Sequence, residues 1–208
     1  MNLPTTPLSC SRSLVLGSTS AYRRELLSRL HIPFAVVGPD MDETPLPSEA
    51  PSAVAERLAL AKAKAVAAKH PHAVVIGSDQ VADLNGQSLG KPGTHDKAVA
   101  QLRQMRGQTV WFHTAVAVVC IDTGFEERSL ASVRVKFRNL MDDEIENYLQ
   151  LEKPYDCAGS AKSEGLGIAL LEAIDSDDPT ALVGLPLIRT CQMLRNAGIA
   201  LLSNTAAS

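Results

Sequence analysis

The segment Leu14–Leu30, which reads LVLGSTSAYRRELLSRL, constrains the fold more than any other part of the sequence. Its apolar start, Leu14–Leu16, predicts a short strand, and leucines at helical spacing farther on predict a helix. Between the two lie the small hydroxylic residues Ser18–Ser20, and the helix opens with Arg23 and Arg24. Free backbone N–H groups at a helix N-terminus, two guanidinium groups and nearby hydroxyls all favour a polyanion. The segment therefore predicts a phosphate-binding site between a strand and a helix.

Strand and helix patterns alternate along the rest of the chain. Apolar and β-branched runs predict strands at Phe34–Val37, Ala73–Gly77, Val81–Leu84, Gln87–Leu89, Val110–Ile121, Ser129–Phe137 and Ile168–Ile174. Helical spacing predicts helices at 51–69, Asp96–Arg106, Asp142–Leu151 and Pro186–Asn196. The Asn85-Gly86 turn signal and the long central strands indicate antiparallel pairs. We therefore expect an α/β fold with a mixed β-sheet and flanking helices, as one domain or as two small lobes.

Composition disfavours several classes of function. The 208 residues carry 20 basic and 23 acidic side chains, a formal charge of −3, which favours neither nucleic acid nor a membrane surface as a partner. No apolar run approaches the ~20 residues that span a bilayer. The four cysteines form no CxxC pair, and the N-terminus lacks the basic and apolar stretches of a targeting segment. We therefore expect a cytoplasmic protein with loose polar ends at 1–11 and 203–208.

Two carboxylates and three cations could act together on phosphate groups. Asp79 follows a buried-type strand, Glu43 lies in an acidic turn, and Arg23, Lys62 and Lys91 supply positive charge. Carboxylates hold Mg²⁺ or Mn²⁺, and cations neutralise charge on phosphate oxygens. Each residue also has a purely structural interpretation, because an Asp after a strand is commonly a turn former or a cap and most lysines are solvated.

Other motifs are less specific. The loop Lys162–Gly167 contains two glycines and fits either a tight turn or a pocket wall, because it lacks both common phosphate-loop patterns. The five histidines form no metal-spaced cluster, and no GxSxG motif supports a serine hydrolase. A Rossmann-type transferase is disfavoured because no glycine-rich fingerprint follows the first strand.

A series of segments, taken together and in this order, resembles the Maf family of nucleoside triphosphate pyrophosphatases. They are LGSTSAYRRELL, VGPDMDETP, RLALAKAKAV, VIGSDQV, GKP, HTAVAV, VRVKFRNL, CAGSAKSEGLGI and LVGLPL, and they extend from about Leu14 to Gly198. The resemblance implies one domain over 1–208 with an ordered core at about 13–200. It implies two lobes around a central cleft, as in inosine triphosphate pyrophosphatase, and cleavage of a nucleotide to its monophosphate and diphosphate with Mg²⁺ or Mn²⁺.

The resemblance also assigns roles to residues that match the family's motifs. It makes Asp79 the catalytic residue and matches Glu43 to the family's acidic turn. From the residues themselves, we expect Asp79 and Glu43 to hold the divalent cation, and either could be its main ligand. The residues expected to bind the substrate phosphates are Ser18, Arg23, Arg24, Lys62 and Lys91. The expected partner is a nucleoside triphosphate, and folds of this kind often form homodimers.

Within the family, the chain looks closest to the branch that acts on 7-methyl-GTP. Gln80 in the GSDQ motif and Glu164 in the KSEG motif carry this likeness. A 7-methylated guanine is positively charged, and an aromatic face would favour it over guanine by about 1–2 kcal/mol. Tyr22 can supply that face and Glu164 a carboxylate, although the branch usually has Pro-Trp where this chain has Ala21-Tyr22.

Two alternative functions stay open at this point. The same reaction could act on other modified nucleotides of the dTTP or UTP type. The nucleotide pocket could instead sense its ligand without hydrolysing it, as part of a regulatory binding module.

Overall fold

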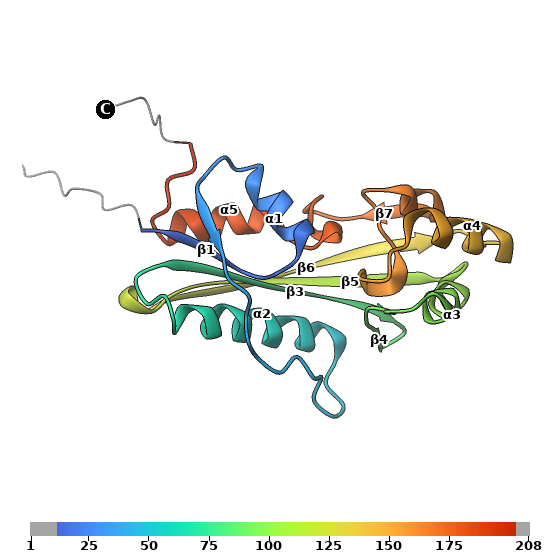
Figure 1. Cartoon of the computed structure of the whole chain (residues 1–208), viewed down its shortest axis with the longest axis horizontal. Helices are drawn as coiled ribbons and strands as arrows, with labels where there is room; N and C mark the ends of the chain where they lie inside the picture. Colours follow the sequence, from blue (N-terminus) through green and yellow to red (C-terminus); the bar gives the residue numbers. More distant parts are fainter. Residues whose placement is uncertain (1–11, 203–208) are drawn as a thin grey trace, which may run out of the picture.

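The computed structural model describes residues 12–202 and places a mixed sheet of seven strands at its centre (Figure 1). The strands are β1 Leu14–Gly17, β2 Phe34–Val36, β3 Val74–Leu84, β4 Gln87–Leu89, β5 Thr109–Cys120, β6 Phe125–Phe137 and β7 Leu171–Asp175. They lie in the order β2-β1-β3-β5-β6-β7, and β4 pairs with β3. β1 is parallel to β2 and β3, whereas the other pairs are antiparallel. The expected α/β fold with a mixed sheet is confirmed.

Helices cover both faces of this sheet. They are α1 Ala21–Ser28, α2 Pro51–Ala67, α3 His95–Met105, α4 Asp142–Glu152 and α5 Leu187–Asn196. α2 lies on one face, and α1 with α5 lies on the other face of the same end, while α3 and α4 lie at the opposite end of the long strands (Figure 1). None of the helices within residues 12–202 has the length and apolar composition that a membrane crossing requires. The predicted loose ends, 1–11 and 203–208, lie outside the described residues.

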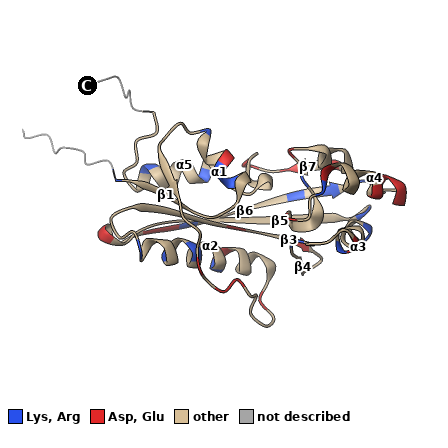
Figure 2. Cartoon of the chain, viewed as in Figure 1, with Lys and Arg blue, Asp and Glu red and all other residues tan. Residues whose placement is uncertain are grey.

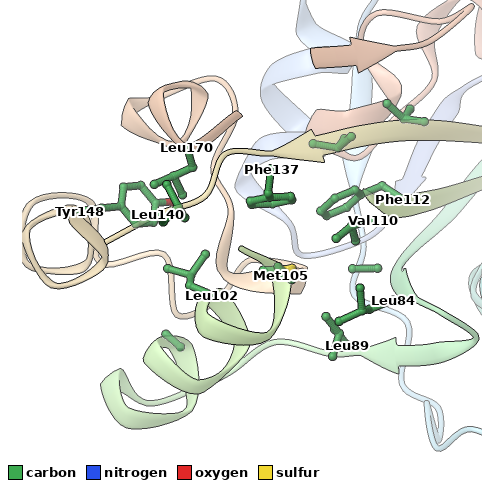
Figure 3. Close-up of a cluster of buried hydrophobic side chains, with 14 of the residues drawn as sticks. Leu84, Leu89, Leu102, Met105, Val110, Phe112, Phe137, Leu140, Tyr148 and Leu170 are labelled. Atoms are coloured by element: carbon green, nitrogen blue, oxygen red, sulfur yellow. The ribbon is translucent and has the colours of Figure 1, made fainter. Parts of the chain in front are cut away.

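Separate apolar cores fill the two ends of the sheet. At one end, α2 packs against β3 and β5 on one face, and α1 with α5 packs on the other. At the other end, Leu102 and Met105 of α3 and Tyr148 of α4 belong to one core with Phe112 and Phe137 of the sheet (Figure 3). Because β3, β5 and β6 run through both cores, the two lobes share one sheet.

The course of β3 differs from the sequence-based expectation. The sequence pattern predicts that Asp79 follows a strand ending at Gly77, but β3 continues without a break to Leu84. The polar residues stay in the ladder because β5 pairs with them throughout, with Asp79 opposite Ala115. The strand that ends here is β1, whose last residue, Gly17, pairs with Gly77. Asp79 therefore lies just past the carboxyl end of β1, where open α/β sheets place their ligands.

Two other strand boundaries also differ. β6 begins at Phe125 and not at Ser129, because a tight turn through Gly124, at φ 68°, lets the pairing with β5 start at once. β7 begins at Leu171 and not at Ile168, because Leu166–Leu170 form a 3-10 turn. The expected hairpin between β3 and β4 is present, with Asn85 and Gly86 both at positive φ.

α2 approaches β3 very closely at Gly77. A Cβ atom there would lie 2.3 Å from the carbonyl oxygen of Ala59 and 2.5 Å from the backbone nitrogen of Ala63. Only glycine opposite small residues permits this approach. The contact brings Lys62, next to Ala63 on the buried face of α2, alongside Asp79 of β3.

Replacing Gly77 with Ala is expected to lower the free energy of unfolding by about 1–3 kcal/mol, because the added methyl group must push α2 away from the sheet. Urea denaturation would measure the change. Gly90→Ala is the control, since a Cβ there meets nothing within 4 Å. Equal stability of the two variants would contradict the close contact.

Candidate active site

A cleft of about 370 Å³ lies between the start of α1 and the segment 156–164, with the middle of β3 as its floor. This volume is typical of small-molecule sites. All the predicted site residues except Arg24 line it, namely Ser18, Tyr22, Arg23, Glu43, Lys62, Asp79, Gln80, Lys91 and Glu164. Residues from distant parts of the sequence therefore meet in one place.

Lys62 joins the two predicted carboxylates at the floor of the cleft. Its Nζ donates to Asp79 Oδ1 at 2.7 Å and to Glu43 Oε2 at 2.6 Å. Lys62 and Asp79 are only 5% and 8% exposed, whereas the Glu43 side chain is about half exposed. A buried ammonium needs such partners because burial of an unpaired charge is very unfavourable. The solvated-lysine interpretation is wrong for Lys62.

The loop that carries Glu43 has no regular secondary structure, but side chains hold it in place. Arg57 of α2 forms two hydrogen bonds to Glu49, each at 2.7 Å, and a third to the carbonyl oxygen of Thr44 at 3.2 Å. Asp42 accepts hydrogen bonds from the backbone N–H and hydroxyl of Thr44. These contacts place Glu43 between them, facing Lys62.

The predicted phosphate-binding segment forms as the sequence indicates. Ser20 is the N-cap of α1, and its hydroxyl accepts a hydrogen bond from the backbone N–H of Arg23 at 3.4 Å. The Arg23 guanidinium donates to Ser18 Oγ at 3.3 Å and to the carbonyl oxygen of Gly184 at 2.8 Å. Burial lowers the pKa of Arg23, while the charges of Asp79 and Glu43 oppose that shift. Arg23 is therefore held rigidly at the cleft wall.

The two other cations predicted to bind phosphate, Lys91 and Arg24, lie at exposed positions. Lys91 lines the cleft and is exposed. Arg24 is exposed on α1 and does not line the cleft. Successive helical residues point about 100° apart, so Arg23 and Arg24 cannot both face one site. Basic and acidic residues are otherwise mixed over the elements (Figure 2).

Gln80 lines the cleft but its amide nitrogen is used to hold a neighbouring segment. Nε2 donates to Thr114 Oγ1 at 2.9 Å and lies 3.1 and 3.0 Å from the carbonyl oxygens of Ala181 and Leu182. Thr114 also donates to Ala181, at 2.9 Å. Gln80 thus fixes the 181–184 wall of the cleft, a contribution that the sequence did not indicate.

Tyr22 and Glu164, the predicted base-recognition residues, both line the cleft. Burial and the nearby Cys157 thiol raise the pKa of Tyr22, so its ring stays neutral near pH 7. Burial also raises the pKa of Cys157 to about 12, which makes it a poor nucleophile. Burial raises the pKa of Glu164 as well. A positively charged ligand beside Glu164 would favour its ionised form and oppose this shift.

The site fits the expected divalent cation. Lys62 takes one oxygen of Asp79 and one of Glu43, so the second oxygen of each carboxylate is available. Within residues 12–202 no group of three or more His, Cys, Asp or Glu side chains is placed to hold a metal. Mg²⁺ is commonly bound by one or two carboxylates together with substrate phosphates, and Glu43 and Asp79 match that donor set.

Sequence reasoning missed part of the cleft wall. Gly184 receives hydrogen bonds from Arg23 and from Ser78 Oγ at 3.1 Å, so it ties α1 to β3. Asp178, which is fully buried, shapes the same segment by accepting hydrogen bonds from Thr180 and from the backbone of Arg189. Gly184 lies in the LVGLPL segment, to which the sequence assigns no role, and the only sequence signal for Asp178 is its place in a proline-containing loop before the last helix.

The chain matches a known protein family over most of its length. The model of the Maf-like protein family matches residues 13–197, which include every residue of the cleft. The chain belongs to the Maf family. Its Maf domain therefore covers both lobes and the cleft between them.

Several relatives of this Maf protein carry the name 7-methyl-GTP pyrophosphatase. The protein of Polaromonas sp. strain JS666 is 77% identical over 194 residues, or 93% of this chain and 89% of the relative. The protein of Albidiferax ferrireducens is 67% identical over 92% of this chain and 96% of the relative. The protein of Aromatoleum aromaticum is 61% identical over 90% of this chain and 97% of the relative. The solved structure of the Ham1 protein of Staphylococcus aureus superposes on this chain with a TM-score of 0.46 and 17% sequence identity. The match covers 62% of this chain and 73% of the Ham1 chain.

Proposed function

We propose that this Maf protein hydrolyses 7-methyl-GTP to 7-methyl-GMP and diphosphate. The observation that carries the proposal is the buried Lys62 ammonium between Asp79 and Glu43, with Arg23 in the same cleft. This arrangement combines a proton acceptor with fixed positive charge, which hydrolysis of a phosphoanhydride requires. The names of the relatives at 61–77% identity support the substrate.

Asp79 accepts the proton of the attacking water in this proposal. The water oxygen forms a bond to the α-phosphorus, and the bond from that phosphorus to the oxygen bridging it to the β-phosphate breaks. The proton passes to the carboxylate of Asp79, and diphosphate leaves. Lys62 orients the Asp79 carboxylate through its hydrogen bond to Oδ1.

Arg23 and Lys91 stabilise charge on the phosphate oxygens. Arg23 is fixed by Ser18 and Gly184, so it needs no rearrangement when charge builds up during the reaction. Lys91 is exposed and can follow the substrate as it enters. Mg²⁺ or Mn²⁺, held by Asp79 and Glu43, would add positive charge at the phosphates and favour ionisation of the attacking water.

Tyr22 and Glu164 select the base. Replacing Tyr22 with Ala or Glu164 with Gln is expected to lower the ratio of kcat/KM for 7-methyl-GTP to that for GTP by roughly tenfold, because each removes a contact that favours a cationic ring. Diphosphate release from both substrates measures the ratio, and turnover of GTP is the internal control. An unchanged ratio in both variants would contradict this assignment.

The same assay separates the alternatives. Preferred cleavage of dTTP or UTP would keep the catalytic residues and reject the assigned base. Bound nucleotide that stays intact with Mg²⁺ present would favour a sensing module.

We also propose that the reaction takes place in the cytoplasm, in keeping with the free thiols of Cys120, Cys157 and Cys191. The homodimer stays a prediction.

A further inference from the structure

We propose that Glu152 is a positioning residue for base selection, which binds Lys162 and thereby keeps the Glu164 carboxylate free for a cationic base. The inference rests on the proposed function, because it concerns discrimination between 7-methyl-GTP and GTP. It adds a residue of α4 to a site otherwise built from α1, α2, β3 and the loops around them.

The carboxylate of Glu152 organises the loop that carries Glu164. Its Oε1 accepts a hydrogen bond from Lys162 Nζ at 2.6 Å, and its Oε2 accepts one from the backbone N–H of Leu166 at 2.8 Å. A Cβ atom at Gly165 would lie 2.8 Å from this carboxylate, so glycine allows the loop to wrap around it. The side chains of Glu152 and Lys162 are mostly buried, at 15% and 28% exposed. The Glu152 carboxylate therefore binds the chain on both sides of Glu164, at Lys162 and at Leu166.

Lys162 binds Glu152, and the charge of a second carboxylate, Glu164, also acts on it. The hydrogen bond to Glu152 is the main cause that raises the pKa of Lys162, and the charge of Glu164 adds to it. Among the described residues, no ion pair involves Glu164, and the hydrogen bond that lowers its pKa comes from its own backbone N–H. The Lys162 ammonium also lies 5.9 Å from the centroid of the Tyr22 ring. Lys162 is thus next to both base-recognition residues, but its partner is Glu152.

Loss of the Glu152 charge would release Lys162 toward Glu164. Pairing with Lys162 would offset the negative charge of Glu164, so Glu164 would attract a positively charged base less strongly. This effect acts against a cationic base and has little influence on neutral guanine. Because Glu152 does not line the cleft, it does not touch the reacting phosphates. The expected consequence is altered selectivity with unaltered chemistry.

Glu152→Gln tests this inference, because glutamine can still accept the hydrogen bond from Leu166 but carries no charge to bind Lys162. We expect the kcat/KM ratio of 7-methyl-GTP to GTP to fall about tenfold, through a higher KM for 7-methyl-GTP, with kcat for GTP unchanged. A ratio equal to that of the wild type would overturn the inference.

The double variant Glu152→Gln/Lys162→Met is the matched control. Without an ammonium, nothing captures Glu164, so the ratio should return to at least the wild-type value. Lys162→Met alone should also keep the wild-type kcat/KM ratio. This single variant tests the inference even if Glu152→Gln does not fold. A reduced ratio in either variant would mean that the pair only supports the loop, and would overturn the inference. Failure of the wild type to hydrolyse 7-methyl-GTP would instead reject the proposed function itself, whereas equal kcat/KM for 7-methyl-GTP and GTP would overturn the assigned base selection together with this inference.

Discussion

Asp79→Asn is expected to reduce kcat by about 10²–10⁴-fold, the range for loss of a positioned proton acceptor. Asparagine has the shape of aspartate and can still accept a hydrogen bond from Lys62 through its Oδ1, where the present bond is 2.7 Å long. Lys62 also keeps Glu43 as a charged partner, so the ammonium does not become unpaired. Steady-state diphosphate release from 7-methyl-GTP, with Mg²⁺ or Mn²⁺, measures the effect.

Asp83→Asn is the matched control for this variant. Asp83 lies on the same strand four residues farther along, where it contacts His113 and the backbone N–H of Gly86 and does not line the cleft. We expect its kcat to stay close to that of the wild type. A folded Asp79→Asn protein that is as active as Asp83→Asn would remove Asp79 from the reaction.

Lys62→Met should have the second largest effect, on both activity and stability. Methionine keeps much of the apolar stem of the lysine but leaves Asp79 buried without its cation and close to Glu43. Removing one partner of a buried pair typically costs about 3–5 kcal/mol, and we expect about 3 kcal/mol here because Glu43 is half exposed. Loss of the positive charge should lower kcat/KM by about 10²–10³-fold.

Chemical denaturation and diphosphate release measure the two effects on Lys62→Met. The control is Lys64→Met on the same helix, where Lys64 forms a surface ion pair with Glu126 at 2.8 Å. Such pairs contribute at most about 1 kcal/mol, so we expect Lys64→Met to be almost neutral. If Lys62→Met were as stable and active as Lys64→Met, the central ion pair would have neither of the proposed roles.

The local features of the site could be predicted from the sequence. The strand, hydroxyl-rich turn and helix from Leu14 to Ser28 form where expected, because the signals involved act over a few residues. Ser20 caps its own helix, and Arg23 follows within the first turn. The Asn85-Gly86 hairpin is local in the same sense.

Features that depend on pairing between distant segments could not be predicted. Polar residues at 78–80 look like the end of a strand, but β5 continues the ladder past them. Spacing along the helix favours a solvated side chain for Lys62. Its burial depends on the contact between α2 and β3 at Gly77, which joins segments that are distant in sequence. Helical spacing implies that Arg23 and Arg24 point in different directions, but which of the two lines the cleft depends on packing between distant segments.

The central claim is that water attacks the α-phosphorus of 7-methyl-GTP in this cleft. The most direct test is one turnover in water enriched in oxygen-18, with mass spectrometry of both products. We predict that the heavy oxygen appears in 7-methyl-GMP and that diphosphate is unlabelled. Heavy oxygen in the diphosphate, or release of orthophosphate in its place, would contradict the claim.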